Sequence, residues 1–238
     1  MNEADGGQVL SENNARFYAG CIINALESLH QQNIIYRMID SQQIAVDING
    51  YLVLYDFMNA KNLSEDGRTS TLCGTKEYFA PEQVSSGNGH GLNVDIWHLG
   101  IFIYELINGT TPFSSDDVQD GGEKGMYDRI IAHKAGSLKS TQSDISKECL
   151  DFINKLVVPK DEKRLKSNKL ASHSWFNDFN IDDLKQGRMS APFEDIVRKL
   201  MQKIYSGKSS VGERKGKGGR NKVATVPYLG DSDWFDGF

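Results

Sequence analysis

The sequence predicts a mainly α fold of the α+β type, and three segments lead to that prediction. From Ala15 to Leu29, apolar residues recur every three or four positions, the pattern of an amphipathic helix with one buried face. The stretch VDIWHLGIFIYELING, residues 94–109, is apolar nearly all round and closes with a glycine at a C-cap position, which predicts a buried central helix. Between these helices, short apolar runs within residues 34–57 flank an Asn49-Gly50 turn, so we expect short strands and a tight hairpin.

The rest of the chain fits the same class. Residues 61–82 are polar, rich in Gly and Thr and without period, which predicts a long loop, and long loops in compact domains are usually functional. Residues 114–124 form an acidic, Gly-rich loop. Amphipathic segments at about 126–135, 144–157 and 168–173 predict further helices that complete a mainly helical body.

The composition changes after Pro192. The segment EDIVRKLMQKIY predicts one further helix, and the Gly/Lys/Ser-rich stretch after it predicts a flexible linker because it can bury little apolar surface. In the final VPYLGDSDWFDGF, aromatic residues alternate with acids, as in a peptide that docks aromatics into a groove. An unstructured tail fits that segment as well.

Composition and charge indicate a folded domain of modest size. The chain has 238 residues, 39% of them hydrophobic and 25% charged, as in ordinary globular proteins. A net charge of -5 gives no overall basic field, so we expect no nucleic-acid partner and no general attraction to anionic membranes. There is no basic, apolar leader and no run of about 18 apolar residues, so we expect a cytoplasmic protein with no membrane span.

The three cysteines, Cys21, Cys73 and Cys149, lie far apart and form no CxxC pair. This spacing favours reduced thiols over disulfides or a zinc site.

Three landmarks follow one another along the chain: Tyr36-Arg37, Asp56-Phe57-Met58 and Ala80-Pro81-Glu82. In this order and spacing they resemble the large C-terminal lobe of a protein Ser/Thr kinase. The segment LCGTKEYFAPE is similar to the activation-loop end of the cyclic-nucleotide branch of the AGC group. HSWFNDFNIDDLKQGRMSAPF and the terminal DWFDGF resemble cyclic GMP-dependent protein kinases in particular.

The resemblance implies a protein kinase-like fold without the small N-terminal lobe. Residues 1–14 would be a lead-in, 15–193 the kinase C-lobe, 194–222 a helix with its linker, and 223–238 an AGC-type C-terminal tail. No segment corresponds to the family's Gly-rich loop, its ATP-contacting Lys or the Glu that pairs with that Lys. Gly87–Gly91 and Gly207-Lys208-Ser209 lack the spacing of a phosphate-binding loop.

The catalytic loop of the family runs Tyr/His-Arg-Asp-Leu-Lys-Pro-Glu-Asn, whereas residues 36–43 read YRMIDSQQ. Met38 therefore stands at the position of the catalytic base, and a thioether cannot take a proton from a Ser or Thr hydroxyl at neutral pH; loss of a general base typically costs about 10²- to 10⁴-fold in rate. Asp40 replaces a phosphate-contacting Lys. Alternatively, Asp40 could serve as a displaced base.

The resemblance implies ATP and magnesium as cofactors. Gln43 stands where the family has a magnesium-binding Asn, and Asp56 keeps the carboxylate of the other magnesium ligand. Met58 replaces the glycine that lets this segment turn. Weak cofactor binding through Gln43 and Asp56 is one interpretation, and a capped turn at a strand end is the other interpretation of Asp56.

The loop also keeps regulatory and substrate positions of the family. Thr71 matches the activation-loop phosphothreonine, and Arg37 could pair with a phosphate there. Thr75 matches the residue that lines the pocket for the substrate residue after the phosphorylation site, although Lys76 replaces the usual Pro.

Three further positions are structural in the family. Glu82 and Arg164 match the two ends of a buried ion pair, and Asp95 matches the acid that braces the catalytic-loop backbone. Removing one partner of such a buried pair typically lowers the free energy of unfolding by about 3–5 kcal/mol. We therefore expect these residues to stabilise the fold.

We therefore expect a pseudokinase-like C-lobe that acts as a binding or scaffolding module. Its partner would be a protein: a kinase small lobe, a kinase substrate or a regulatory subunit. Two alternatives remain. One is a piece of an active Ser/Thr kinase whose small lobe is supplied elsewhere, and the other is a truncated gene product, suggested by Met1 standing inside the kinase domain.

Overall fold

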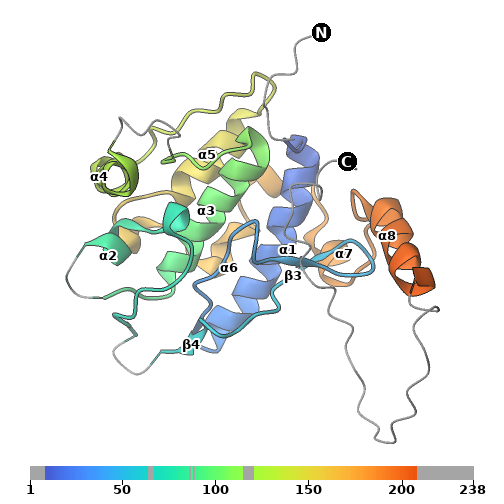
Figure 1. Ribbon diagram of the computed structural model, residues 1–238. Helices are drawn as coiled ribbons and strands as arrows, with labels where there is room; N and C mark the ends of the chain where they lie inside the picture. The colour runs from blue at the N-terminus through green and yellow to red at the C-terminus, as the bar shows by residue number, and fades with distance from the viewer. Residues whose placement is uncertain (1–8, 64–66, 86, 88, 115–120, 208–238) are drawn as a thin grey trace, which may run out of the picture.

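The computed structural model describes residues 9–63, 67–85, 87, 89–114 and 121–207. Helices dominate this part of the chain (Figure 1). Its strands are two residues long and form two antiparallel pairs. The mainly α class is confirmed. The predicted linker and C-terminal tail lie outside the described residues, apart from the helix that precedes them.

The first helix, α1, spans Glu12–Gln31 and begins three residues earlier than the apolar pattern predicts. Ser11 is its N-cap, and its side chain accepts a hydrogen bond from the Asn14 amide at 3.3 Å. Such a cap lies outside the apolar stripe and is found only by looking upstream of it. Ile22 and Leu26 on the buried face are fully covered by the core.

The central helix, α3, spans Asn93–Asn108 and is buried along most of its length. Gly109 ends it with φ of 77°, a left-handed conformation that glycine adopts without strain. α3 packs against both α1 and α5 (Lys147–Leu156), so it lies in the middle of the helical layer (Figure 1).

Four short strands form the two pairs, and each pair contacts α1. β2 (Ala45–Val46) and β3 (Leu52–Val53) form the predicted hairpin, with Ala45 opposite Val53. β1 (Ile34–Ile35) pairs with β4 (Lys61–Asn62), and Ile34 lies opposite Asn62.

The prediction of one unstructured loop over residues 61–82 was wrong in part. It contains β4, the 3₁₀ turn η1 (Lys76–Tyr78) and the start of α2 (Pro81–Val84). Elements of two to four residues carry no periodicity of their own, because they are stabilised by the partner they pack on rather than by their own pattern.

The remaining helices follow the prediction with shifted bounds. α4 (Gly122–Ala132) begins about four residues earlier than predicted, and α6 (Ser167–Leu170) is a single turn. α7 (Ile181–Lys185) and the 3₁₀ turns η3 (Asp161–Lys163) and η4 (Ser174–Phe176) were not predicted. The last described helix, α8, spans Glu194–Gly207.

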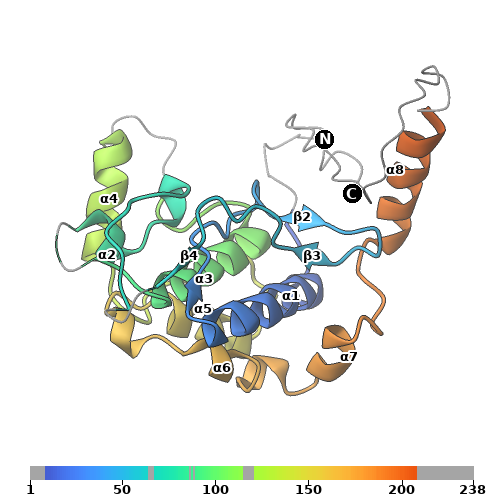
Figure 2. The same cartoon turned by 90° about the horizontal axis from the view of Figure 1, so that it is seen from below.

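A smaller apolar cluster joins α1, α7 and the segment before α8. It contains Phe17, Tyr18, Leu184 and Ala191, with Phe193 packed on it. Figure 2 shows α8 beyond this cluster, at the edge of the molecule next to the β2–β3 hairpin. The three cysteines are free thiols, as predicted. No helix among the described residues has both the length and the apolar character needed to cross a bilayer.

Candidate functional site

The loop that follows β1 is held on α3 by Asp95. The Asp95 carboxylate accepts hydrogen bonds from the backbone amides of Tyr36 at 2.8 Å and Arg37 at 2.7 Å. His30 bonds to the same carboxylate at 2.9 Å, and Asp95 is fully buried. Arg37 has φ of 66°, which is uncommon for a residue with a Cβ. The two hydrogen bonds from backbone amides to Asp95 hold the backbone in this strained turn.

The Arg37 side chain joins this loop to two other segments. Its Nε donates to the Asn59 carbonyl at 2.7 Å, and its Nη1 donates to the Thr71 carbonyl at 3.2 Å. Gly74 lies directly against the loop with φ of 103°, and a Cβ there would come within 2.8 Å of the Arg37 carbonyl oxygen. The three segments thus form one packed unit.

Asp40 is buried, with 1% of its surface exposed, and its carboxylate faces residue 75 of the activation loop. Thr75 Oγ1 donates a hydrogen bond of 2.5 Å to Asp40 Oδ2, while Oδ1 accepts from the Gln42 amide at 2.9 Å. Burial raises the pKa of Asp40, and these hydrogen bonds oppose the rise only in part. The structure therefore holds a desolvated carboxyl group where the resemblance expects a lysine.

Met38 is half-buried and packs against the main core. The Asn59 side-chain amide lies 3.0 Å from its sulfur. A thioether is only a weak hydrogen-bond acceptor and has no proton-accepting role at neutral pH. The position that the family resemblance assigns to the catalytic base thus holds an apolar side chain with one weak hydrogen bond.

Asp56 caps a turn: its Oδ1 accepts a hydrogen bond from the Met58 amide at 2.8 Å. The Phe57 ring meets Tyr36 edge-on, with 5.4 Å between ring centroids. Met58 projects from the surface with 84% exposure. Gln43 is half-buried, and its backbone amide donates to the Asp40 carbonyl at 3.2 Å. Within the described ranges, no three His, Cys, Asp or Glu side chains cluster closely enough to hold a metal.

The Thr71 side chain is exposed, two residues after the buried Thr69. Lys61 Nζ donates to the Thr69 hydroxyl at 3.1 Å, and Thr69 pairs through its backbone with His90. Sequence reasoning missed Lys61. Its signal is a basic residue at the start of a polar loop, but the pattern does not say which side chain it meets.

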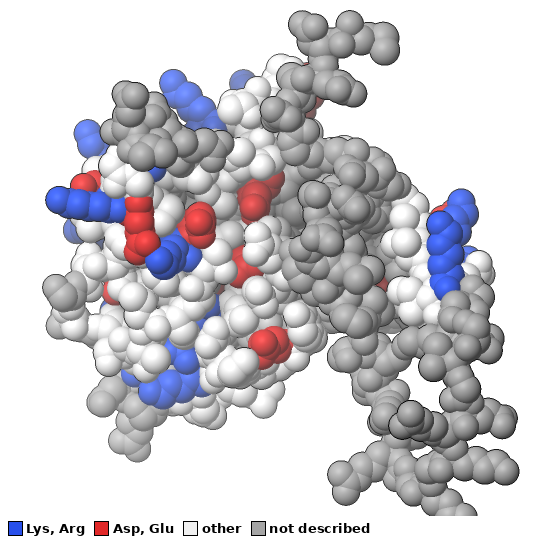
Figure 3. All heavy atoms as spheres, viewed as in Figure 1, with Lys and Arg blue, Asp and Glu red and all other residues white. Residues whose placement is uncertain are grey.

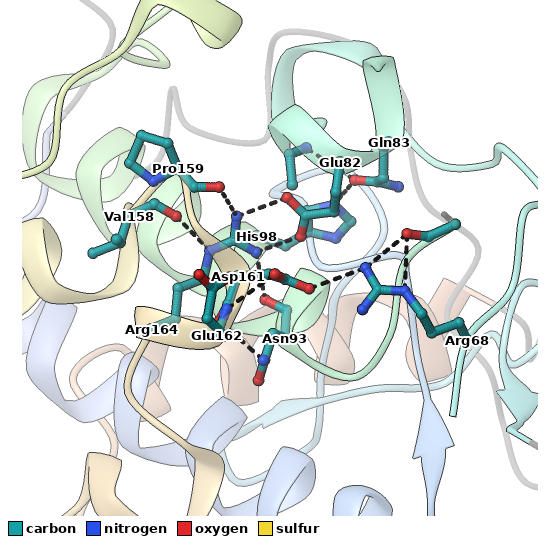
Figure 4. A network of polar contacts seen from close by, with 12 residues as sticks. Arg68, Glu82, Gln83, Asn93, His98, Val158, Pro159, Asp161, Glu162 and Arg164 are labelled. Carbon is teal, nitrogen blue, oxygen red and sulfur yellow. Dashed lines mark hydrogen bonds and ion pairs between the residues drawn. The ribbon is translucent and has the colours of Figure 1, made fainter. Parts of the chain in front are cut away.

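Glu82 and Arg164 form a bidentate ion pair, shown in Figure 4. Arg164 Nη1 lies 2.5 Å from Glu82 Oε1, and Nη2 lies 2.8 Å from Oε2. The Arg164 side chain is fully buried, and that of Glu82 is 13% exposed. Arg164 also donates to the carbonyls of Val158 and Asn93 at 2.7 and 3.0 Å, and its guanidinium lies 5.0 Å from the Trp97 ring centroid. This network ties α2 to the end of α5 and the start of α3.

Next to this ion pair lies a buried polar pair that sequence reasoning also missed. Gln83 Oε1 accepts from the Ala80 amide at 2.9 Å and lies 2.9 Å from His98 Nε2. Burial lowers the pKa of His98 to about 4, so the ring is neutral at pH 7.

Tyr78 links α3 to the catalytic loop. Its hydroxyl donates to the Glu105 carboxylate and accepts from the Ser41 amide at 3.2 Å. Burial raises the pKa of Glu105 as it does that of Asp40, and the charges of these two carboxyls repel each other.

Comparison with known proteins gives these residues their context. The sequence model of the family described as protein kinase domain matches residues 2–176. The chain belongs to the protein kinase family. The kinase resemblance and the C-lobe-like fold predicted from the sequence are confirmed.

The kinase relatives are AGC-type Ser/Thr enzymes. The catalytic subunit of cAMP-dependent protein kinase from Dictyostelium discoideum is 38% identical over 188 residues, which is 77% of this chain and 27% of that protein. Serine/threonine-protein kinase sck1 of Schizosaccharomyces pombe is 35% identical over 79% of the chain and 26% of its own length. Isozyme 1 of cGMP-dependent protein kinase from Drosophila melanogaster is 35% identical over 76% of the chain and 23% of its own length. The chain thus spans about a quarter of the length of these relatives.

Proposed function

We propose that this kinase C-lobe is a pseudokinase-like protein-binding module and does not transfer phosphate. The observation that supports this most strongly is the hydrogen bond between Thr75 and the buried carboxyl group of Asp40. This carboxyl group stands at the loop position where the family resemblance predicts a lysine that contacts phosphate.

Phosphoryl transfer depends on positioning and on neutralising the charge of the transferred group. A carboxylate in place of a lysine has the opposite effect. Two like charges about 4 Å apart repel by about 4 kcal/mol at an effective dielectric constant near 20. Asp40 faces Thr75 rather than an open position, so it is also poorly placed to act as a displaced base.

The described residues do not fit ATP with magnesium. Of the family's phosphate- and metal-holding groups, they offer the carboxylate of Asp56 and the side-chain amide of Gln43. One Asp56 oxygen is already used to cap the turn at Met58. These groups are too few to hold and orient a nucleotide for phosphoryl transfer.

An apolar surface lies beside the altered loop, and we call it the Phe57 surface. Its exposed members are Tyr55 (45%), Phe57 (48%), Met58 (84%) and Leu72 (54%). Because Arg37 donates to the carbonyls of Asn59 and Thr71, the segments that carry Met58 and Leu72 lie next to each other. Exposed apolar side chains gathered in this way are typical of a protein-binding surface. We propose a protein partner there: a kinase small lobe, a kinase substrate or a regulatory subunit.

A phosphotransfer assay tests the proposal. The full chain is incubated with labelled ATP, magnesium and a generic basic peptide, and we expect no incorporation above a sample without protein. Incorporation that the Asp40→Ala substitution abolishes would refute the proposal, because it would make Asp40 a working base.

The second candidate is the large lobe of an active Ser/Thr kinase whose small lobe comes from another chain. The retained Asp95 brace and the Asp56 carboxylate favour it. This candidate predicts activity on addition of a small lobe, lost on Asp56→Ala substitution. The pseudokinase proposal predicts binding without activity.

A further inference from the structure

Exposed lysines recur at three-residue spacing on the segment that leads from α5 through η3 into α6. They are Lys160, Lys163, Lys166 and Lys169, and we call them the lysine surface. The Lys163 amide donates to the Lys160 carbonyl at 3.0 Å, and the Lys169 amide donates to the Lys166 carbonyl at 2.8 Å. Residues joined in this way, three apart, lie on the same side of their turn. The lysines of each pair are therefore neighbours.

The body of the domain anchors this segment between and after the two pairs. Arg164 lies between the pairs, is buried, and donates hydrogen bonds to Glu82 through both of its terminal nitrogens, as Figure 4 shows. Leu170, directly after the second pair, is fully buried in the main core. Since the backbone of the lysine surface is already placed, little of its ordering has to occur on binding.

The positive charge of the lysine surface is not offset nearby. Within the part of the chain that the structure describes, none of the four ammonium groups takes part in an ion pair. Of the two acids in residues 160–169, Asp161 pairs with Arg68 at 3.2 Å, so only Glu162 remains to offset the lysines. Residues 160–169 contain five Lys or Arg and two Asp or Glu, while the other residues contain 22 and 30.

The small extent of this basic surface favours a short acidic partner over an extended polyanion. The rest of the chain is acidic, and Figure 3 shows Asp and Glu side chains spread over the face seen in that view. A nucleic acid or an anionic bilayer would extend past the lysines and meet this negative charge. A bilayer would also find no apolar anchor, because residues 155–173, all of which the structure describes, expose no large apolar side chain.

We propose that the lysine surface binds a short acidic segment of a partner protein, whose carboxylates meet the ammonium groups. Lysine suits such a segment because its ammonium is a rotatable point charge that needs no fixed geometry in its partner. Figure 2 shows α6 on the far side of α1 from the β2–β3 hairpin, and no residue of the lysine surface belongs to the Phe57 surface. The inference therefore goes beyond the proposed function.

The experiment titrates the full chain into a fluorescein-labelled peptide of ten glutamates. We expect saturable binding, weakened at least tenfold in the double variant Lys166→Glu with Lys169→Glu. The control is Lys134→Glu with Lys139→Glu, which makes the same change of charge at exposed lysines outside the surface and should weaken binding less than threefold. Unchanged melting curves of both double variants show that the fold is intact, as the exposure of the four substituted lysines predicts.

Three results would overturn the proposal. The first is no saturable binding of the wild-type chain to the glutamate peptide. The second is equal weakening by the two double variants, which indicates attraction by overall charge or by the basic residues within 208–222. The third is tighter binding to single-stranded DNA of ten nucleotides or to phosphatidylserine vesicles than to the peptide, which assigns the surface to another class of partner.

Discussion

The Thr75 hydroxyl donates a hydrogen bond of 2.5 Å to the buried carboxylate of Asp40. This bond connects the activation segment to the catalytic loop. The family resemblance predicts that both residues stand at positions that serve substrate and phosphate in kinases. In this chain they satisfy each other. This contact is the main support for our proposal that the loop does not take part in phosphoryl transfer.

Asp40→Asn should raise the free energy of unfolding at pH 7, by about 1.4 kcal/mol for each unit by which the folded pKa of Asp40 exceeds the unfolded one. Burial raises the pKa of Asp40 in the folded state, so the folded protein loses stability as pH rises from the ordinary carboxyl pKa through the folded one. Asn removes the buried charge and can still bond to Thr75 and to the Gln42 amide. Urea unfolding at pH 7 measures the gain, which should disappear below about pH 4. Asp128→Asn, at an exposed carboxylate, is the control, and a loss of stability in Asp40→Asn would contradict the account.

Glu82→Gln should destabilise the fold by about 3–5 kcal/mol, because it leaves the fully buried guanidinium of Arg164 without its counter-charge. The matched control is Glu123→Gln, the same chemical change in the exposed pair with Lys76, and it should leave the unfolding midpoint unchanged. Chemical denaturation of the two variants and the wild-type chain measures the free energies of unfolding that this prediction compares. Equal stability of both would show that the buried network does not support the fold.

Acid should destabilise the protein through His98. Its folded pKa, lowered by burial to about 4, lies below that of an unfolded histidine, so the unfolded state binds more protons as pH falls from about 6.5 to 4. Stability is present above this window and is lost within it, by about 3 kcal/mol for His98 alone. His98→Gln should flatten the dependence of unfolding free energy on pH between 7 and 4.5. Identical slopes for the variant and the wild type would exclude His98 as the cause.

The Phe57 surface should make the isolated chain associate. Sedimentation velocity should show an average mass that rises with concentration, and Met58→Glu should reduce this rise because it places a charge in the apolar patch. Ile131→Glu is the control, since Ile131 is 52% exposed on α4 and lies outside the surface. If the wild-type chain remains monomeric at all concentrations, or if both variants act alike, the surface has no special role in association.

The sequence predicted the elements that have their own periodicity or a strong local turn. α1, α3 and the Asn49-Gly50 hairpin belong to this group, because burial of one helix face or the geometry of a two-residue turn is written in adjacent residues. β4 and α7 were missed since their few residues are stabilised by contacts with distant segments. Ser11 was missed because the cap precedes the apolar stripe.

The same distinction holds for the site. Motif order predicted that Met38 and Asp40 are altered catalytic-loop positions, and the chemistry of a thioether and a carboxylate follows from residue type alone. That Asp40 is buried and bonded to Thr75, 35 residues along the chain, depends on tertiary packing. The Gln83–His98 pair was equally out of reach, since a glutamine and a histidine in apolar surroundings do not indicate that they meet.

ATP binding is the most direct test of the central claim that this kinase C-lobe is a binding module without a working nucleotide site. The full chain is melted with increasing ATP in the presence of magnesium, with magnesium alone as the control. A ligand at 100 times its dissociation constant stabilises a protein by about 2.7 kcal/mol, which a melting curve detects readily. We predict no change in Tm up to millimolar ATP. A saturable rise in Tm that Asp56→Ala removes would contradict the account and favour the second candidate, the large lobe of an active kinase.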